Sequence, residues 1–279
     1  MNAPRVSIIT PAYNAARYLP QAVASVIEQS FQNWELIIIN DGSTDATRDY
    51  LDTLTDPRIR VIHQENGGVS RARNAGLECA RGAFVTFMDA DDALPRGSLA
   101  VRVRYLDAHP EVTVVDGRIT IKDAALATTL RERVGGNRGP YFSRLIRLDS
   151  SVFFGVAVMV RRAAIGTTRF ENGLSHCEDL LFLLEAANKR DWVYGAVDEA
   201  VYLYRTGAGS AMSDLEGLES GYLYLYGRCR LLEEATAEDL AYLYRRIRRI
   251  LVRSWLRRGQ LSRALKFYIR LKSLANFKL

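Results

Sequence analysis

Residues 83–92 have the sequence AFVTFMDADD, in which six mostly apolar residues are followed by three acids in four positions. The apolar part is typical of a strand that is buried on both faces of a sheet. In extended backbone, residues two apart project to the same side, so Asp89 and Asp91 point together while Asp92 points elsewhere. Convergent carboxylates without histidine or thiolate favour a hard divalent cation, Mg²⁺ or Mn²⁺. The sequence therefore predicts a metal site at Asp89 and Asp91.

The residues before this strand alternate between strand and helix patterns. Short β-rich runs end at Pro11, at Asp41-Gly42-Ser43 and near His63, and apolar residues at helical spacing lie between them. Strands with continuous apolar runs that are joined by helices indicate a mostly parallel α/β sheet covered on both faces. Ligands of such sheets bind at the carboxyl ends of the strands.

The alternation weakens after Ile121, and this change predicts three parts. We expect a flexible loop at 135–140, a strand at 153–161, a helix at 178–189, strands at 192–197 and 201–204, and an all-helical end. The predicted division is residues 1–122, residues 123–212, and residues 213–279, the last being a basic helical C-terminal extension.

Composition excludes several classes of protein. With 279 residues, 48% hydrophobic and 25% charged, the chain has the composition of an ordinary folded protein. No apolar run approaches the ~20 residues of a membrane-spanning helix, and the first residues contain no apolar signal core. Cys79, Cys177 and Cys229 are odd in number and far apart, which fits neither a disulfide framework nor a zinc site. We therefore expect a cytoplasmic protein.

Positive charge is concentrated at the C-terminal end. Residues 240–279 contain twelve Lys or Arg and no acid. Since the whole chain carries +6, residues 1–239 carry −6. Trp255 and Tyr268 accompany the basic residues on amphipathic segments, which suits an anionic membrane surface at the inner face of the membrane. The alternative is a helical pair that packs on the body with a solvated arginine face, and both can be true. Nucleic acid is not expected, because no recognised module accompanies the charge.

Two further strand ends bear side chains that packing does not require. Tyr13 follows the first strand, and Asp41 stands on a tight turn after the second. Each feature alone is commonly structural, as a packed aromatic, a turn or a helix cap. Together with the acids at 89–92 they lie at one edge of one predicted sheet, and this convergence indicates a binding site.

Four motifs carry a resemblance to a known family. In order along the chain they are VSIITPAYN (6–14), WELIIINDGSTD (34–45), NGGVSRARNAG (66–76) and ARGAFVTFMDADD (80–92). The chain resembles the inverting glycosyltransferases of family 2, which have the GT-A fold, a Rossmann-like fold of nucleotide-diphospho-sugar transferases. Beyond residue 100 the resemblance thins to Phe154-Gly155, Glu178-Asp179 and Tyr204-Arg205.

The resemblance implies that residues 1–122 are the nucleotide-sugar-binding part and residues 123–212 the acceptor-binding and catalytic part. The position of Tyr13 stacks on the base, that of Asp41 accepts a hydrogen bond from the base, and the Asp89 and Asp91 pair holds Mn²⁺ or Mg²⁺ and the ribose. Arg71 and Arg73 add positive charge near the phosphates, or Arg73 instead buttresses the acidic loop. The complete implied set is Pro11, Tyr13, Asp41, Arg73, Asp89, Ala90 and Asp91.

The resemblance also implies a catalytic base, Asp179, with Glu178 orienting the site or the acceptor. Acids at the start of a helix are stabilised as anions, and an ionised carboxylate is the form that accepts a proton. The alternative for Asp179 is a simple helix N-cap. In one departure from the family, no histidine follows Tyr204-Arg205 within the next five residues, so a metal ligand from this loop is not expected.

The predicted function is metal-dependent transfer of a sugar from a nucleotide-diphosphate donor, with UDP favoured, to a saccharide or lipid-linked hydroxyl acceptor. The pathway class is synthesis of cell-surface polysaccharide or glycolipid. Two alternatives remain at this point. A sugar nucleotidyltransferase shares the architecture but would have a glycine-rich Arg/Lys signature after the first strand, and a non-catalytic GT-A-fold binding protein would be expected to lack the acids.

Overall fold

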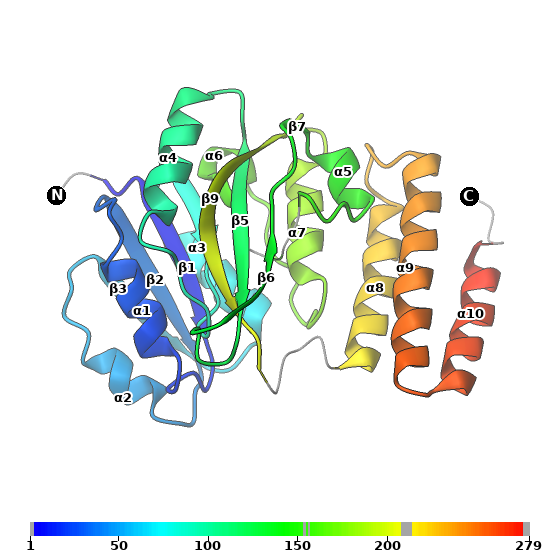
Figure 1. Ribbon diagram of the computed structural model, residues 1–279, viewed down its shortest axis with the longest axis horizontal. Coiled ribbons are helices and arrows are strands. Elements are labelled where there is room, and N and C mark those ends of the chain that lie inside the picture. Colours follow the sequence, from blue (N-terminus) through cyan, green and yellow to red (C-terminus); the bar gives the residue numbers. More distant parts are fainter. Residues whose placement is uncertain (1–2, 153–154, 156, 208–213, 276–279) are drawn as a thin grey trace.

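The computed structural model describes residues 3–152, 155, 157–207 and 214–275, the last seven through their backbone alone. Strand β1 (Val6–Ala12) lies at the centre of the first half of a sheet (Figure 1). It pairs in parallel with β2 (Trp34–Asp41) and with β4 (Phe84–Phe87), and β3 (Ile59–Gln64) pairs in parallel with β2. This half is the predicted parallel sheet.

The second half extends the same sheet with mixed directions. Strand β8 (Met159–Arg161) is antiparallel to both β4 and β5 (Val114–Lys122), whereas β9 (Val193–Arg205) is parallel to β5. The strand order is β3-β2-β1-β4-β8-β5-β9-β7, with β7 at Gly139–Pro140 and β6 (Thr129–Arg133) paired to β5. The sheet thus continues across residue 122, and the division into three parts stays a prediction.

Three expectations differ from the structure. The loop expected at 135–140 contains the two-residue strand β7. The strands predicted at 192–197 and 201–204 are one continuous strand, β9. The strand expected at 153–161 is present only as β8, and residues 153–154 and 156 of that prediction lie outside the described residues.

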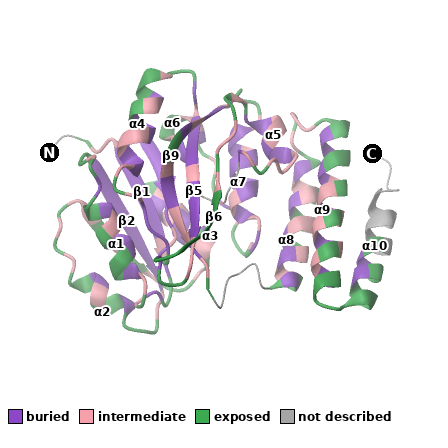
Figure 2. Cartoon of the chain, in the orientation of Figure 1, coloured by how far each residue is buried: buried purple, intermediate pink, exposed green. Residues whose placement is uncertain are grey.

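Helices cover both faces of the sheet. Alternate strand residues such as Ile8 and Ile38 pack with α1 (Leu19–Ile27) and α4 (Ser98–Ala108). The intervening residues, such as Ile9, pack with α3 (Val69–Cys79) and α7 (Glu178–Ala187). Burial on both faces, visible as purple strands in Figure 2, explains the unbroken apolar runs of the sequence.

Shorter helices connect these layers. They are α2 (Thr47–Asp52), α5 (Phe142–Ile146) and α6 (Arg162–Ile165). Within the described chain, no helix is long and apolar enough to cross a membrane. All three cysteines are free, as predicted.

The C-terminal extension is a layer of three helices beside the body (Figure 1): α8 (Leu215–Cys229), α9 (Ala237–Arg257) and α10 (Leu261–Ala275). Helix α9 begins at a capping box in which the Thr236 hydroxyl accepts the Asp239 N–H. Its apolar residues belong to the same buried cluster as those of α7. The expected helical pair therefore does pack on the body.

Candidate active site

The acidic turn follows β4 at the carboxyl edge of the sheet. Asp92 is 1% exposed, and its Oδ1 accepts the Arg205 N–H at 2.7 Å. Asp91 is exposed, and the Asp89 side chain is 38% exposed. The expectation that Asp92 points away from the other two is confirmed. Although part of its surface is exposed, the protein around the Asp91 carboxyl partly desolvates it, and this desolvation and then the charge of Asp89 raise its pKa.

Arg205 holds this turn in place. It is 6% exposed, and its Nε donates to the Asp91 carbonyl oxygen. Its Nη1 donates to the carbonyl of Ala124 at 2.6 Å and its Nη2 to Gln21 of α1 at 2.8 Å. The sequence marked Arg205 only as part of a weak motif. The structure shows that it ties the acidic turn to α1 and to the β5–β6 connection.

Arg73 joins the acidic turn to the start of α7. It is 4% exposed, and its Nη2 contacts Asp89 Oδ1 at 2.9 Å while its Nη1 contacts Glu178 Oε1 at 2.8 Å. Burial alone would lower the pKa of Arg73, but the charges of Asp89, Glu178 and Asp179 raise it above its usual value. These contacts agree with the alternative in which Arg73 supports the acidic loop. Contact between Arg73 and a phosphate stays a prediction.

Asp179 lies in the first turn of α7 beside this ion pair. The N-cap position is Cys177, which has a left-handed φ of 63° and no capping side-chain bond, so the N-cap alternative for Asp179 is wrong. Asp179 Oδ1 accepts the Leu180 N–H at 2.7 Å. A Cβ on Gly155 would lie 3.4 Å from Asp179 Oδ2, so a glycine leaves space beside that oxygen. Burial, and then Glu178, raise the pKa of Asp179 to about 7.

Helix α8 packs directly behind the loop that bears these acids. A Cβ on Gly221 would lie 2.6 Å from the backbone oxygen of His176, and one on Gly217 would lie 2.5 Å from the His176 ring. Only glycine permits this approach. The C-terminal extension is thus in contact with the segment that positions Glu178 and Asp179.

The loops after β1 and β2 are bound to each other. The side chain of Asn14, which has φ of 48°, accepts the Thr44 N–H at 2.8 Å, and the Asn14 N–H donates to Ser43 Oγ at 3.0 Å. Tyr13 lies on the first of these two connected loops, and 54% of its surface is exposed. The sequence alone did not predict the role of Asn14. An asparagine directly after a strand is the signal that could have found it.

Asp41 is 3% exposed, and internal donors occupy both of its carboxylate oxygens. Oδ1 accepts from Gln64 Nε2 at 2.6 Å and from the Gly67 N–H at 3.0 Å, while Oδ2 accepts the Gly68 N–H at 2.8 Å. Asp41 therefore fixes the turn that precedes α3. Its predicted bond to a nucleotide base would use a remaining lone pair.

Comparison with known proteins agrees with this geometry. Residues 7–167 match the protein family described as Glycosyl transferase family 2. An uncharacterized glycosyltransferase of Haemophilus influenzae is 34% identical over 193 residues, which are 66% of this chain and 72% of that protein. This chain belongs to glycosyl transferase family 2.

Another relative is a Bacillus subtilis glycosyltransferase named for teichuronic acid biosynthesis, TuaG. It is 44% identical over 106 residues, which are 37% of this chain and 42% of that protein.

Solved structures of glycosyltransferases share the fold. Staphylococcus aureus TarS in complex with UDP-GlcNAc superposes with a TM-score of 0.70 at 21% identity, covering 96% of this chain and 81% of that chain. The mannosyltransferase PcManGT of Pyrobaculum calidifontis, in complex with GDP-Man and Mn²⁺, has a TM-score of 0.65 at 19% identity, covering 100% of this chain and 82% of that chain. The predicted GT-A fold and enzyme class are confirmed.

The acidic turn of this family 2 enzyme suits a divalent cation. Desolvation and then the charge of Asp89 raise the pKa of Asp91, and a cation held by the two carboxylates would offset both effects. In the described chain, no group of three or more His, Cys, Asp or Glu side chains is arranged to hold a metal. Two carboxylates leave ligand positions for water and substrate phosphates, which Mg²⁺ and Mn²⁺ commonly use. The loop after Tyr204-Arg205 was not expected to supply a metal ligand, and its residues 208–213 lie outside the described residues.

Proposed function

We propose that this chain transfers a sugar from a UDP-sugar to a hydroxyl group of a saccharide or lipid-linked acceptor, with inversion at the anomeric carbon. The pathway class is cell-surface polysaccharide or glycolipid synthesis, in line with the name of the TuaG relative. The UDP-GlcNAc complex of TarS supports a nucleotide-sugar donor, and the GDP-Man complex of PcManGT makes a guanosine donor the competing choice.

One observation carries the proposal: Arg73 joins Asp89 to Glu178, which lies 105 positions after Arg73 in the sequence. The donor side of the reaction requires carboxylates at the end of β4, and the acceptor side requires a base. Because Asp179 follows Glu178 directly, the Arg73 bridge supports a single site that is built from two separate sequence motifs.

The direct displacement has a simple balance. The acceptor oxygen bonds to the anomeric carbon on the face opposite the leaving group, the bond from that carbon to the diphosphate oxygen breaks, and the acceptor proton moves to Asp179 Oδ2. Oδ2 is the oxygen we assign, because Oδ1 already accepts the Leu180 N–H. A proton acceptor whose pKa is near neutrality is suited to this step at physiological pH.

Other residues hold the donor. Asp89 and Asp91 would hold Mn²⁺ or Mg²⁺, which when bound neutralises the leaving diphosphate. Tyr13 offers an exposed ring for the base, on a loop that the Asn14 bonds fix in place. Pro11, Asp41 and Ala90 complete the proposed nucleotide-sugar site, and Glu178, bound by Arg73, keeps Asp179 in position.

Donor binding tests the proposal. Nucleotide sugars are screened by thermal shift with and without Mn²⁺, because a ligand that binds the native state raises the melting temperature. We expect a UDP-sugar to bind in a Mn²⁺-dependent manner, and Asp91→Asn to lose this binding while the free protein melts normally. Undiminished Mn²⁺-dependent binding by Asp91→Asn would contradict the metal assignment. The first anomer released on slow donor hydrolysis tests stereochemistry, since a retained configuration is incompatible with direct displacement.

A further inference from the structure

One side of α9 is a row of exposed arginines, which we call the basic face of α9: Arg245, Arg249, Arg253 and Arg257. At 100° per residue, positions four apart share one side of a helix. The opposite side of α9 is buried against the body through Leu243, Ile247, Leu251 and Trp255. The apolar side of α9 is therefore buried, and its arginines are exposed to solvent.

Trp255 belongs to the buried side and not to the basic face. It is 3% exposed, and its Nε1 donates to Glu219 of α8 at 3.0 Å. Trp255 accompanies the basic residues in the sequence, but its ring packs inside the helical layer and is not presented on the surface. Arg270, Lys272 and Lys278 also belong to the acid-free basic segment at 240–279. The side chains of Arg270 and Lys272, and the whole of Lys278, lie outside the described part of the chain.

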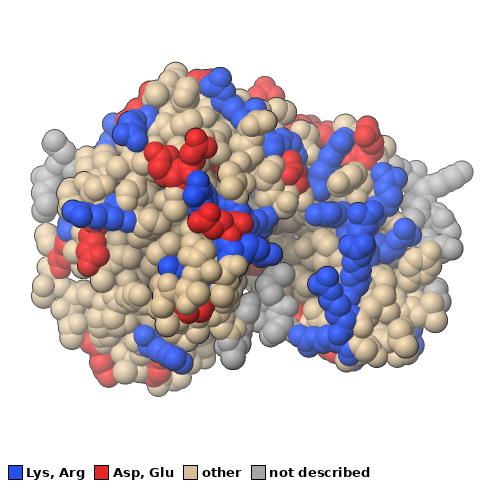
Figure 3. Space-filling model, in the orientation of Figure 1, with Lys and Arg blue, Asp and Glu red and all other residues tan. Residues whose placement is uncertain are grey.

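The arginines of the basic face have no acidic partner within the described residues. The ion pairs found there include neither Arg245, Arg249, Arg253 nor Arg257. Arginines nearby behave differently, since Arg147 pairs with Asp239 and Arg228 with Glu185. Figure 3 shows Lys and Arg side chains gathered over the α8 and α9 region, whereas acids and bases alternate over the body.

Apolar side chains flank the basic face. Tyr242 and Leu256, near the two ends of α9, are 40% and 45% exposed and lie on the same side as the arginines. The C-terminal layer contains seven of the chain's eleven exposed large hydrophobic side chains among the described residues: Tyr224, Leu231, Tyr242, Leu256, Leu261, Leu265 and Tyr268. A surface that combines arginines with exposed Leu and Tyr suits the interface of a bilayer.

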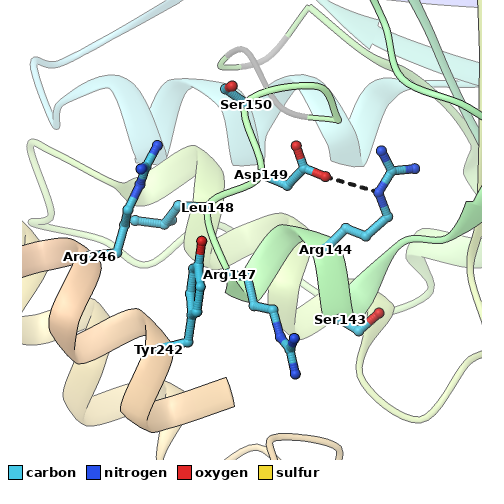
Figure 4. A pocket seen from close by; sticks show the side chains of 8 residues that line it. All are labelled: Ser143, Arg144, Arg147, Leu148, Asp149, Ser150, Tyr242 and Arg246. Carbon is cyan, nitrogen blue, oxygen red and sulfur yellow. Dashed lines mark hydrogen bonds and ion pairs between the residues drawn. The ribbon is translucent and has the colours of Figure 1, made fainter. Parts of the chain in front are cut away.

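A single small anion does not fit this arrangement. The cavity next to the basic face, about 490 Å³ between α5 and α9, is lined by three arginines. Figure 4 shows that Arg144 pairs with Asp149 and that Arg147 points away from Arg246. The guanidinium groups do not converge on one point. The basic face itself extends over about 18 Å, since its twelve-residue span rises ~1.5 Å per residue, which is the geometry for an extended anionic surface.

We infer that the basic face of α9 binds the anionic surface of a phospholipid bilayer. A bilayer is favoured over nucleic acid because the face is a convex helix surface flanked by leucine and tyrosine, without a groove or a stacking platform for bases. In Figure 1 the C-terminal end of α9 lies at the same end of the molecule as the carboxyl ends of β1 and β2. The inference does not rest on the proposed function, since vesicle binding requires neither donor nor acceptor.

Sedimentation of the full chain with vesicles tests the inference. Wild type should pellet with phosphatidylglycerol vesicles at low salt, and much less at 1 M salt, where the Debye length is ~3 Å instead of ~10 Å. It should not pellet with pure phosphatidylcholine. Each arginine near an anionic surface contributes roughly a factor of five to partitioning, so the triple variant Arg245→Gln, Arg249→Gln, Arg253→Gln should bind about 100-fold more weakly.

The matched control removes the same charge from the body: Arg48→Gln, Arg60→Gln and Arg104→Gln, all exposed residues. It should pellet nearly as wild type, and thermal melts should show that both triple variants are folded. Three results would overturn the inference: no pelleting of wild type at low salt, equal losses in the two triple variants, or retention on RNA through the same arginines with no affinity for vesicles.

Discussion

Replacing Arg73 by methionine should destabilise the protein strongly. The substitution removes a guanidinium that is 4% exposed and contacts Asp89 at 2.9 Å and Glu178 at 2.8 Å. Methionine has a similar length but no charge, so the carboxylates of Asp89, Glu178 and Asp179 would then face one another without a cation.

The size of the expected loss of stability follows from the burial of Arg73. Removing one partner of a buried ion pair costs about 3–5 kcal/mol, because the remaining charge is desolvated without compensation. For a chain of this size, each kcal/mol lowers the melting temperature by ~2–4 °C. Arg73→Met should therefore melt at least about 6 °C below wild type. Since Arg73 lowers the pKa of Asp179, its loss should raise that pKa further above 7, and the deficit should be smaller at about pH 6 than at about pH 8.

Calorimetry or a circular dichroism melt at the two pH values measures this effect. The control is Arg71→Met, two residues away on the same helix but exposed, which should change stability by less than about 0.5 kcal/mol. If Arg73→Met melted like Arg71→Met, or if its deficit were the same at both pH values, the Arg73 bridge would not have the electrostatic role assigned to it.

Three further predictions concern residues around the site and in the core. Gly221→Val should lower both the melting temperature and sugar transfer, because its side chain would collide with the His176 backbone; Gly227→Val, with open space at its Cβ, is the control, and equal effects would argue against specific packing. Asp116, whose pKa burial raises to about 6, binds its proton more tightly in the native state, so wild type should lose about 3 kcal/mol relative to Asp116→Asn between about pH 4 and pH 7; parallel stability curves in denaturant would refute this. Arg205→Lys should weaken Mn²⁺-dependent donor binding about tenfold or more, because lysine cannot make the same set of side-chain bonds to Asp91, Ala124 and Gln21; titration of the donor at fixed Mn²⁺ decides it.

The sheet could be predicted well from sequence because its first half obeys local rules. The apolar run at residues 84–87 and the acids after it fix both a strand and its end. Periodicity could not show that β9 is one strand, since a bulge and polar residues at Asp198 and Glu199 interrupt its pattern. The mixed directions in the second half depend on long-range pairing, which no local signal reports.

The candidate site was partly predictable for a related reason. Acids at strand ends are visible in the sequence, so Asp89 and Asp91 could be proposed from the residues alone. The contacts that hold the site join residues far apart, such as the hydrogen bond of Arg205 with Gln21 and the close packing of Gly221 against His176. The sequence could not show that Trp255 is buried, because an amphipathic helix has the same spacing of apolar residues whether they face a membrane or a protein core.

The measurement that tests the central claim most directly compares Asp179→Asn with wild type in sugar transfer and in donor affinity. Asparagine keeps the shape of the side chain but cannot accept the acceptor proton, and loss of a general base typically slows transfer ~10²–10⁴-fold. The account predicts that loss with unchanged Mn²⁺-dependent donor affinity, and normal transfer by the control Asp198→Asn, an exposed residue of β9. Near-normal turnover by Asp179→Asn would contradict the assignment of Asp179 as the base.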